Sequence, residues 1–234
     1  MSRQDIAAEV AILREMERRK SRRKLWAYFP DEGPLRRDLY PQHLQFFELG
    51  ATVCTRCFMA ANRVGKTEGG GGYETVLHLT GRYPHWWKGR RFDHAIDAWA
   101  AGDTKETVRD IIQLKLVGPE SAYGTGLIPG DDMVKVVRRP NGNGALDYVE
   151  VKHASGGTSR LGFKSYDQGR EAFQGTEKHL IWRDEDSSEG VRGGNVAVNL
   201  EGPRRGREVQ RVEQRLVRAL GETWRASEAG EAGS

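Results

Sequence analysis

One eight-residue segment constrains this chain more than any other. Residues 60–67 read AANRVGKT and lie between an apolar, β-rich run at 52–60 and a helix pattern at 74–80. A strand, a loop whose N–H groups converge, a lysine, a hydroxyl residue and a helix N-terminus are the parts of a Walker A phosphate loop. Ala60 stands where such loops usually carry glycine, which restricts the backbone only modestly. The segment therefore predicts a site for nucleotide phosphates.

The same pattern assigns roles within the loop. Lys66 is expected to reach the terminal phosphates and Thr67 to bind Mg²⁺. Arg63 either stabilises charge on the γ-phosphate in the transition state or faces solvent. The residues that we expect to contact nucleotide are Ala60, Ala61, Asn62, Arg63, Val64, Gly65, Lys66 and Thr67.

A second constraint is the acidic run that follows a strand pattern at 179–182. Hydrolysis of a nucleotide needs one carboxylate in the Mg²⁺ shell and another that orients the attacking water. Asp184 is predicted to bind the metal and Glu185 to be the catalytic base, with Asp186 a close neighbour. Arg183 is unusual here, because a buried strand favours apolar residues. The alternative is an acidic turn after a buried strand.

Upstream, Tyr40 is followed by two glutamines, Gln42 and Gln45, within a short helix pattern at 41–49. Many phosphate-loop motors read the adenine edge at this position with a stacked ring and an amide. Which glutamine would do so stays open, and an ordinary place on the helix surface is the alternative for each.

The order of the remaining patterns predicts an α/β fold. A strand pattern at 94–102 is followed by a helix pattern at 103–118 that opens with a capping box, Asp103 and Glu106. Alternating strands and helices indicate parallel strands. Three further strand patterns, separated by Gly/Asn turns, indicate a hairpin-rich segment, and they span 134–139, 147–153 and 159–166. Four glycines at 69–72 suggest that the helix after the loop starts late or is loose.

We therefore expect a phosphate-loop NTPase domain of the RecA/ASCE type over residues 25–189, with a mainly parallel sheet flanked by helices. Residues 1–24 carry apolar side chains at helical spacing and end in a basic run, which predicts a basic N-terminal helix. Residues 190–234 are rich in Arg, Gly and Glu and lack Lys and Asp, the composition of a disordered, low-complexity tail.

Composition sets only broad limits. Lys and Arg total 37 against 33 Asp and Glu, and this net charge of +4 permits a polyanionic partner without requiring one. No stretch approaches about 18 consecutive apolar residues, so we expect a cytosolic protein without a membrane span. Cys54 and Cys57 form a lone C-x-x-C in a strand pattern, which favours strand residues over a metal or redox site.

Across residues 23–189 the sequence resembles the N-terminal ATPase half of the large terminase subunit of tailed bacteriophages. The AANRVGKT loop with the later PHWW segment, the YDQGREAFQG run and the acidic RDED carry the resemblance. It implies a motor that uses ATP and Mg²⁺ to drive double-stranded DNA into a capsid in the bacterial cytoplasm. It also implies a small terminase subunit, a portal protein and a ring of identical subunits as partners. The family's ATP loop falls on 60–67, its metal carboxylate on Asp184 and its catalytic glutamate on Glu185.

Three features depart from that family. Its Ser/Thr-rich coupling motif is not recognisable after residue 190, no Asp follows Asp186 to build its nuclease domain, and the tail resembles nothing in it. We therefore expect a truncated or frameshifted chain derived from a prophage. Two alternatives stay open: a non-catalytic remnant that at most binds nucleotide or a partner, and another phosphate-loop DNA translocase or helicase, against which the missing second sheet domain argues.

Overall fold

A computed structural model describes residues 23–61, 63–140, 143–168, 173, 177–185 and 195–200, with residues 6, 9, 10, 12–16 and 19 near the N-terminus. Of Glu185, 195–197 and 199 it describes only the backbone. The described residues before Arg23 are helical, and Arg23 is in a turn. The apolar side chains of Ile6, Val10, Leu13 and Met16 are exposed. Of the tail expected over 190–234, the structure describes only residues 195–200.

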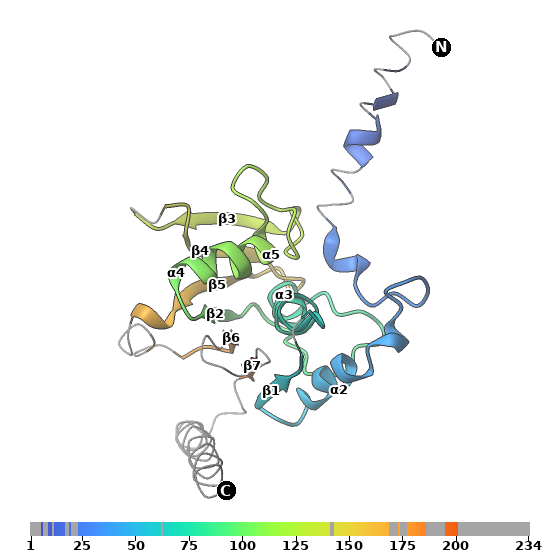
Figure 1. The fold of residues 1–234 in the computed structure, drawn as a ribbon, viewed down its shortest axis with the longest axis vertical. Helices are drawn as coiled ribbons and strands as arrows, with labels where there is room; N and C mark the ends of the chain where they lie inside the picture. The colour runs from blue at the N-terminus through green and yellow to red at the C-terminus, as the bar shows by residue number, and fades with distance from the viewer. Residues whose placement is uncertain are drawn as a thin grey trace, which may run out of the picture. The chain divides into compact units, whose positions relative to one another are not determined.

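Seven strands form one sheet. They are β1 (Thr55–Met59), β2 (Asp97–Gly102), β3 (Met133–Arg138), β4 (Leu146–Lys152), β5 (Thr158–Ser165), β6 (Leu180–Glu185) and β7 (Asn195–Leu200). Their order across the sheet is β1-β7-β6-β2-β5-β4-β3 (Figure 1). β2 pairs in parallel with β5 and β6, whereas the other four neighbouring pairs are antiparallel.

The expected α/β class is confirmed, but the expectation of a mainly parallel sheet is wrong, because the sheet is mixed. The reason is the length of the connections. Segments 139–145, 153–157 and 186–194 join neighbouring strands, and each is shorter than the dozen or so residues that a parallel crossover needs. The expected end of the domain at residue 189 is also wrong, because β7 belongs to the sheet and lies in the range whose composition predicts a tail.

The main helices follow the expected segments closely. They are α2 (Pro41–Leu49), the π-helical η3 (Lys66–Gly72) continuing into α3 (Tyr73–Thr80), and a second continuous helix made of α4 (Lys105–Thr107), η4 (Val108–Gln113) and α5 (Leu114–Val117). Three short 3₁₀ turns are η1 (Lys24–Ala27), η2 (Arg37–Leu39) and η5 (Tyr166–Gln168). One detail differs from expectation: Thr104, not Asp103, caps α4, because its hydroxyl accepts the N–H of Thr107 at 3.1 Å.

The four glycines at 69–72 lie inside η3 and are buried. They allow the helix to approach the sheet closely. A Cβ on Gly71 would lie 2.2 Å from the indole nitrogen of Trp182, and one on Gly72 would lie 2.8 Å from the Thr67 carbonyl oxygen. Gly71 thus gives up helix propensity for contact with β6, whereas the Thr67 carbonyl that confines Gly72 belongs to the same helix.

The three main helices pack on the same face of the sheet (Figure 1). On that face Gly102 faces Val108 and Ile112, Trp182 faces Gly71, and the ring of Phe58 stacks on Phe46 with centroids 5.4 Å apart. Strand register turns the fully buried Ala98, Ala100, Leu161 and Phe163 toward the same layer. No helix among the described residues is long and apolar enough to span a membrane.

Candidate phosphate-binding site

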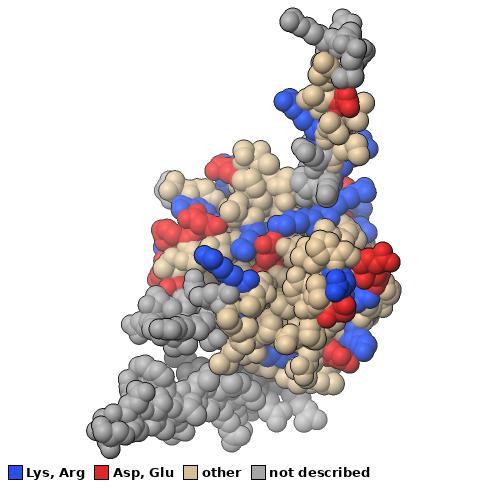
Figure 2. All heavy atoms as spheres, turned by 45° about the vertical axis from the view of Figure 1, so that its right-hand side comes forward, with Lys and Arg blue, Asp and Glu red and all other residues tan. Residues whose placement is uncertain are grey.

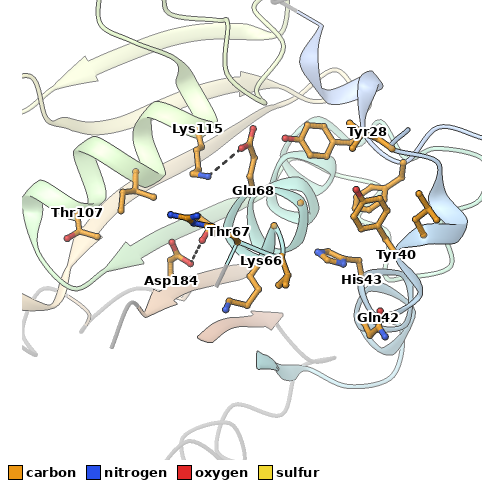
Figure 3. A pocket seen from close by; sticks show the side chains of 18 residues that line it. Tyr28, Tyr40, Gln42, His43, Lys66, Thr67, Glu68, Thr107, Lys115 and Asp184 are labelled. Carbon is orange, nitrogen blue, oxygen red and sulfur yellow. Dashed lines mark hydrogen bonds and ion pairs between the residues drawn. The ribbon is translucent and has the colours of Figure 1, made fainter. Parts of the chain in front are cut away.

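Strand directions bring the two predicted motifs to one edge of the sheet. β1 and β6 are both antiparallel to β7 and hence run the same way, and β2 and β5 share that direction. Their carboxyl ends therefore meet at one edge, where open α/β sheets generally bind ligands. The edge borders a pocket of about 800 Å³, lined by the phosphate-loop segment, Asp184, α2 and one face of the 105–117 helix (Figure 3).

Two described residues of the loop have a positive φ. Gly65 has a φ of 84°, in the left-handed region that favours glycine. Arg63 has a φ of 66°, which costs conformational free energy because a residue with a Cβ is strained in that region. The Gly65 carbonyl accepts the N–H groups of Gly69 and Gly70 at 2.7 and 3.1 Å, so the loop passes directly into the helix. Asn62 lies outside the described residues.

Lys66 lies against the inside of this loop. Its side chain is nearly buried, with the residue 7% exposed. The ammonium donates to the carbonyl oxygen of Ala60 and, at 2.9 Å, to that of Ala61. These acceptors are the first two residues of the loop, so the lysine charge is held inside the backbone curve that would surround a phosphate.

The hydroxyl of Thr67 donates to Oδ1 of Asp184 at 3.0 Å, which joins the two predicted motifs directly. Asp184 is the penultimate residue of β6 and is 9% exposed. A hydroxyl and a carboxylate oxygen at this separation fit Mg²⁺, which prefers oxygen ligands. In the described part of the chain no group of three or more His, Cys, Asp or Glu side chains could hold a metal ion. Mg²⁺ sites in general use one or two carboxylates together with substrate phosphates and water. The side chain of Glu185 lies outside the described residues.

A charged cluster that sequence patterns do not reveal lies beside Thr67, and its members Tyr28, Glu68 and Lys115 line the pocket. Glu68 pairs with Lys24 from η1 and with Lys115 from α5, the latter at 3.4 Å, and the Tyr28 hydroxyl also bonds to it. Burial tends to raise the pKa of Glu68, but these partners outweigh it and the pKa is lowered. Burial is likewise the main cause that raises the pKa of Tyr28. The carboxylate is therefore ionised and the phenol neutral at physiological pH.

The opposite wall comes from α2 and the chain before it. His43 is buried between Phe29, Tyr40 and Phe58, whose ring is 4.8 Å from the imidazole centroid. Burial lowers the pKa of His43, and a hydrogen bond to the Gly65 backbone only partly opposes this. The imidazole is thus neutral near pH 7 and links α2 to the loop.

The two candidate glutamines differ in position. Both are exposed on α2, but Gln42 is among the residues that line the pocket (Figure 3) and Gln45 is not. Apolar Leu35 and Leu39 complete this end of the pocket. The pocket therefore has a charged end at the loop and an apolar, aromatic end at α2.

Sequence reasoning found Lys66, Thr67 and Asp184 but missed Glu68, Lys115 and His43. A weak signal for Lys115 exists in hindsight. Thr107, Ile111 and Lys115 are spaced by four and follow the end of β2, so they share the helix face that lines the pocket.

Comparison with known proteins gives a consistent family. Residues 57–189 match the family model described as terminase large subunit, T4likevirus-type, N-terminal. The chain is 33% identical over 195 residues to the large terminase subunit of Salmonella phage P22, with 75% of this chain covered. The same match covers 37% of that relative, so the chain spans little more than a third of its length. No solved structure matches the chain significantly.

Proposed function

Because this chain belongs to the family of large terminase subunits, we propose that it is the ATPase domain of a DNA-packaging motor. In this proposal the 60–67 loop binds ATP, and hydrolysis is coupled to translocation of double-stranded DNA into a capsid.

The observation that supports this proposal most directly is the Thr67–Asp184 hydrogen bond. It joins two motifs 117 positions apart through a half-buried contact between two oxygen atoms of residues that line the pocket. A Gly-Lys-Thr triplet that occurred in a loop by chance would have no reason to meet an aspartate at the end of another strand. Phosphoryl transfer needs this arrangement of a hydroxyl and a carboxylate on either side of a metal ion.

Each residue has a defined role in the proposed reaction. Lys66 exchanges its bonds to Ala60 and Ala61 for bonds to the β- and γ-phosphates, and Arg63 offsets charge on the γ-phosphate. Glu185 orients and deprotonates the attacking water. Mg²⁺ bound by Thr67 and Asp184 would supply neutralisation of the phosphate charge. At the other end of the pocket Tyr40 and Gln42 bind the adenine ring.

The partners follow from the family alone and are proposals for this chain. DNA would be held through its phosphates, because a motor must pass any sequence, and such binding weakens with added salt. A small terminase subunit and a portal protein would supply the DNA and the capsid entrance. The motor would work as a ring of identical chains in the cytoplasm of the bacterial host.

Calorimetry with Mg²⁺-ATP tests the proposal. The wild-type chain should bind, and Lys66→Ala should abolish binding, whereas Lys88→Ala removes an exposed lysine outside the pocket and should bind as the wild type does. Glu185→Gln should then bind ATP without hydrolysing it. If the wild-type chain binds no nucleotide, the proposal is wrong and the non-catalytic alternative holds.

A further inference from the structure

Lys115 is the feature of the pocket that the proposed roles leave unused. It extends from α5 toward Glu68 at the pocket wall, near Thr67 (Figure 3). Its side chain is 35% exposed and its ammonium is 3.4 Å from the nearer Glu68 oxygen. That separation allows a loose ion pair rather than a close hydrogen bond.

The Glu68 carboxylate has more cationic partners than its own charge requires. Lys24 forms a closer contact with it than Lys115 does, and the Tyr28 hydroxyl adds a neutral donor. Lys24 is absent from the pocket wall, whereas Lys115 lines it. If Lys115 left, Glu68 would therefore keep an ion-pair partner, and the pocket would not gain an uncompensated negative charge.

From this arrangement we propose that Lys115 is a second phosphate-binding lysine, which moves from Glu68 to the outer phosphates of a bound nucleoside triphosphate while Lys24 and Tyr28 keep Glu68 neutralised. The inference rests on the proposed nucleotide site and names a specificity determinant within it. Lys115 then favours a triphosphate over shorter phosphate chains, because only the longer chain reaches across the pocket to α5.

The alternative is a purely structural ion pair between α5 and η3. The structural role and the phosphate-binding role predict different effects on nucleotide affinity when Lys115 or Glu68 is replaced. Loss of a structural pair affects stability more than ligand choice, whichever partner is removed. A phosphate-binding lysine affects affinity in proportion to the phosphates present, and removal of its resting partner does not weaken binding.

Calorimetry on the full chain with Mg²⁺ and the β,γ-imido analogue of ATP, ADP or AMP separates these roles. Lys115→Gln should lower affinity for the triphosphate analogue about tenfold, the value of one charge-assisted hydrogen bond, and leave affinity for AMP unchanged. Glu68→Gln breaks the same ion pair but should bind the triphosphate at least as tightly as the wild type. Lys105→Gln, on the same helix but outside the pocket wall, is the matched control and should have no effect.

The outcomes are distinct. Equal affinity of wild type and Lys115→Gln for the triphosphate, or equal losses for all three nucleotides, overturns the role of Lys115 while the nucleotide site stands. Equal losses in Lys115→Gln and Glu68→Gln show a structural pair and also overturn it. If neither wild type nor variants bind any nucleotide, the proposed site and this inference both fail.

Discussion

Gly71 and Trp182 are in direct contact at the centre of the fold. A Cβ on Gly71 would lie 2.2 Å from the indole nitrogen of Trp182 and 2.6 Å from Cδ1. Trp182 is fully buried and is paired on both sides, with Ala100 on β2 and Val198 on β7. Trp182 lies two residues before Asp184 on β6, and Gly71 lies four residues after Thr67 in the same helix, so this contact and the bond between Thr67 and Asp184 join the same two elements.

Gly71→Ala should therefore destabilise the chain by about 1–3 kcal/mol, the usual cost of overpacking a core. Gly69→Ala is the matched control, because its Cβ would meet neighbours only at 3.7 and 3.8 Å. It should be neutral or gain up to about 1 kcal/mol from helix propensity. Chemical denaturation measures both, and equal effects would mean that the glycine run serves no packing purpose.

A buried ion pair anchors α3 to β1. Arg56 donates to Glu74 at 2.8 Å and to the Phe46 carbonyl at 2.5 Å, and both charged side chains are buried. Removal of one partner, as in Glu74→Leu, leaves an uncompensated charge and should cost about 3–5 kcal/mol. The double variant Arg56→Met/Glu74→Leu should recover most of that loss. A double variant as unstable as the sum of its single variants would argue against coupling between the two charges.

The two glutamines of α2 offer a direct test of the adenine end. Gln42→Ala should weaken binding of ATP but leave binding of inorganic triphosphate unchanged, because only the base is read there. Gln45→Ala, on the same helix but outside the pocket wall, should bind both as the wild type does. Competition calorimetry with the two ligands compares them. If Gln45→Ala gives the larger effect, the base occupies a different wall.

Stability should fall with acidification through His43. Because burial lowers its pKa from 6.5, the unfolded chain takes up a proton at higher pH than the folded chain does. The stabilising contribution is complete above about pH 6.5 and is lost as the pH falls toward the folded-state pKa. His78 and His153 are shifted in the same direction, also mainly by burial.

His43→Phe keeps an aromatic ring in the same cluster and removes one of these titrations. It should lower the pH dependence of the unfolding free energy below pH 6.5 by at most about 1.4 kcal/mol per pH unit. Urea denaturation at a series of pH values measures this, and the data at pH 8 separate lost packing from lost titration. An unchanged slope would place the acid sensitivity at the other two histidines.

Those parts of the site that lie in one continuous stretch could be predicted from sequence. The loop, its lysine and its hydroxyl residue need a fixed local spacing, and Asp184 follows a strand that is apolar enough to recognise. Glu68, Lys115 and His43 could not be found in this way. Each is a single residue whose role comes from a neighbour in another element, and no local pattern records that neighbour.

The fold shows the same division. The 41–49 helix and six strands follow from periodicity, whereas β7 was missed, because its Asn195–Leu200 sequence lies in a segment that is otherwise rich in Gly and Arg. Strand direction was misjudged for a related reason. The alternation of strands and helices predicts parallel pairing, but the length of each connection determines strand direction. The 186–194 connection is too short for a parallel crossover, and β7 pairs with β6 in the antiparallel direction.

The position of β7 has a consequence for the dimensions of the site. β1, which leads into the loop, does not pair with β6, which carries Asp184; β7 lies between them and pairs with both. The two strand ends are therefore two strand spacings apart, about 10 Å, and η3 crosses this interval to bring Thr67 to Asp184. The six residues of β7 thus act as a spacer between the two strands. Without them β1 would pair directly with β6, and the loop would be about 5 Å too close to the carboxylate that it has to face.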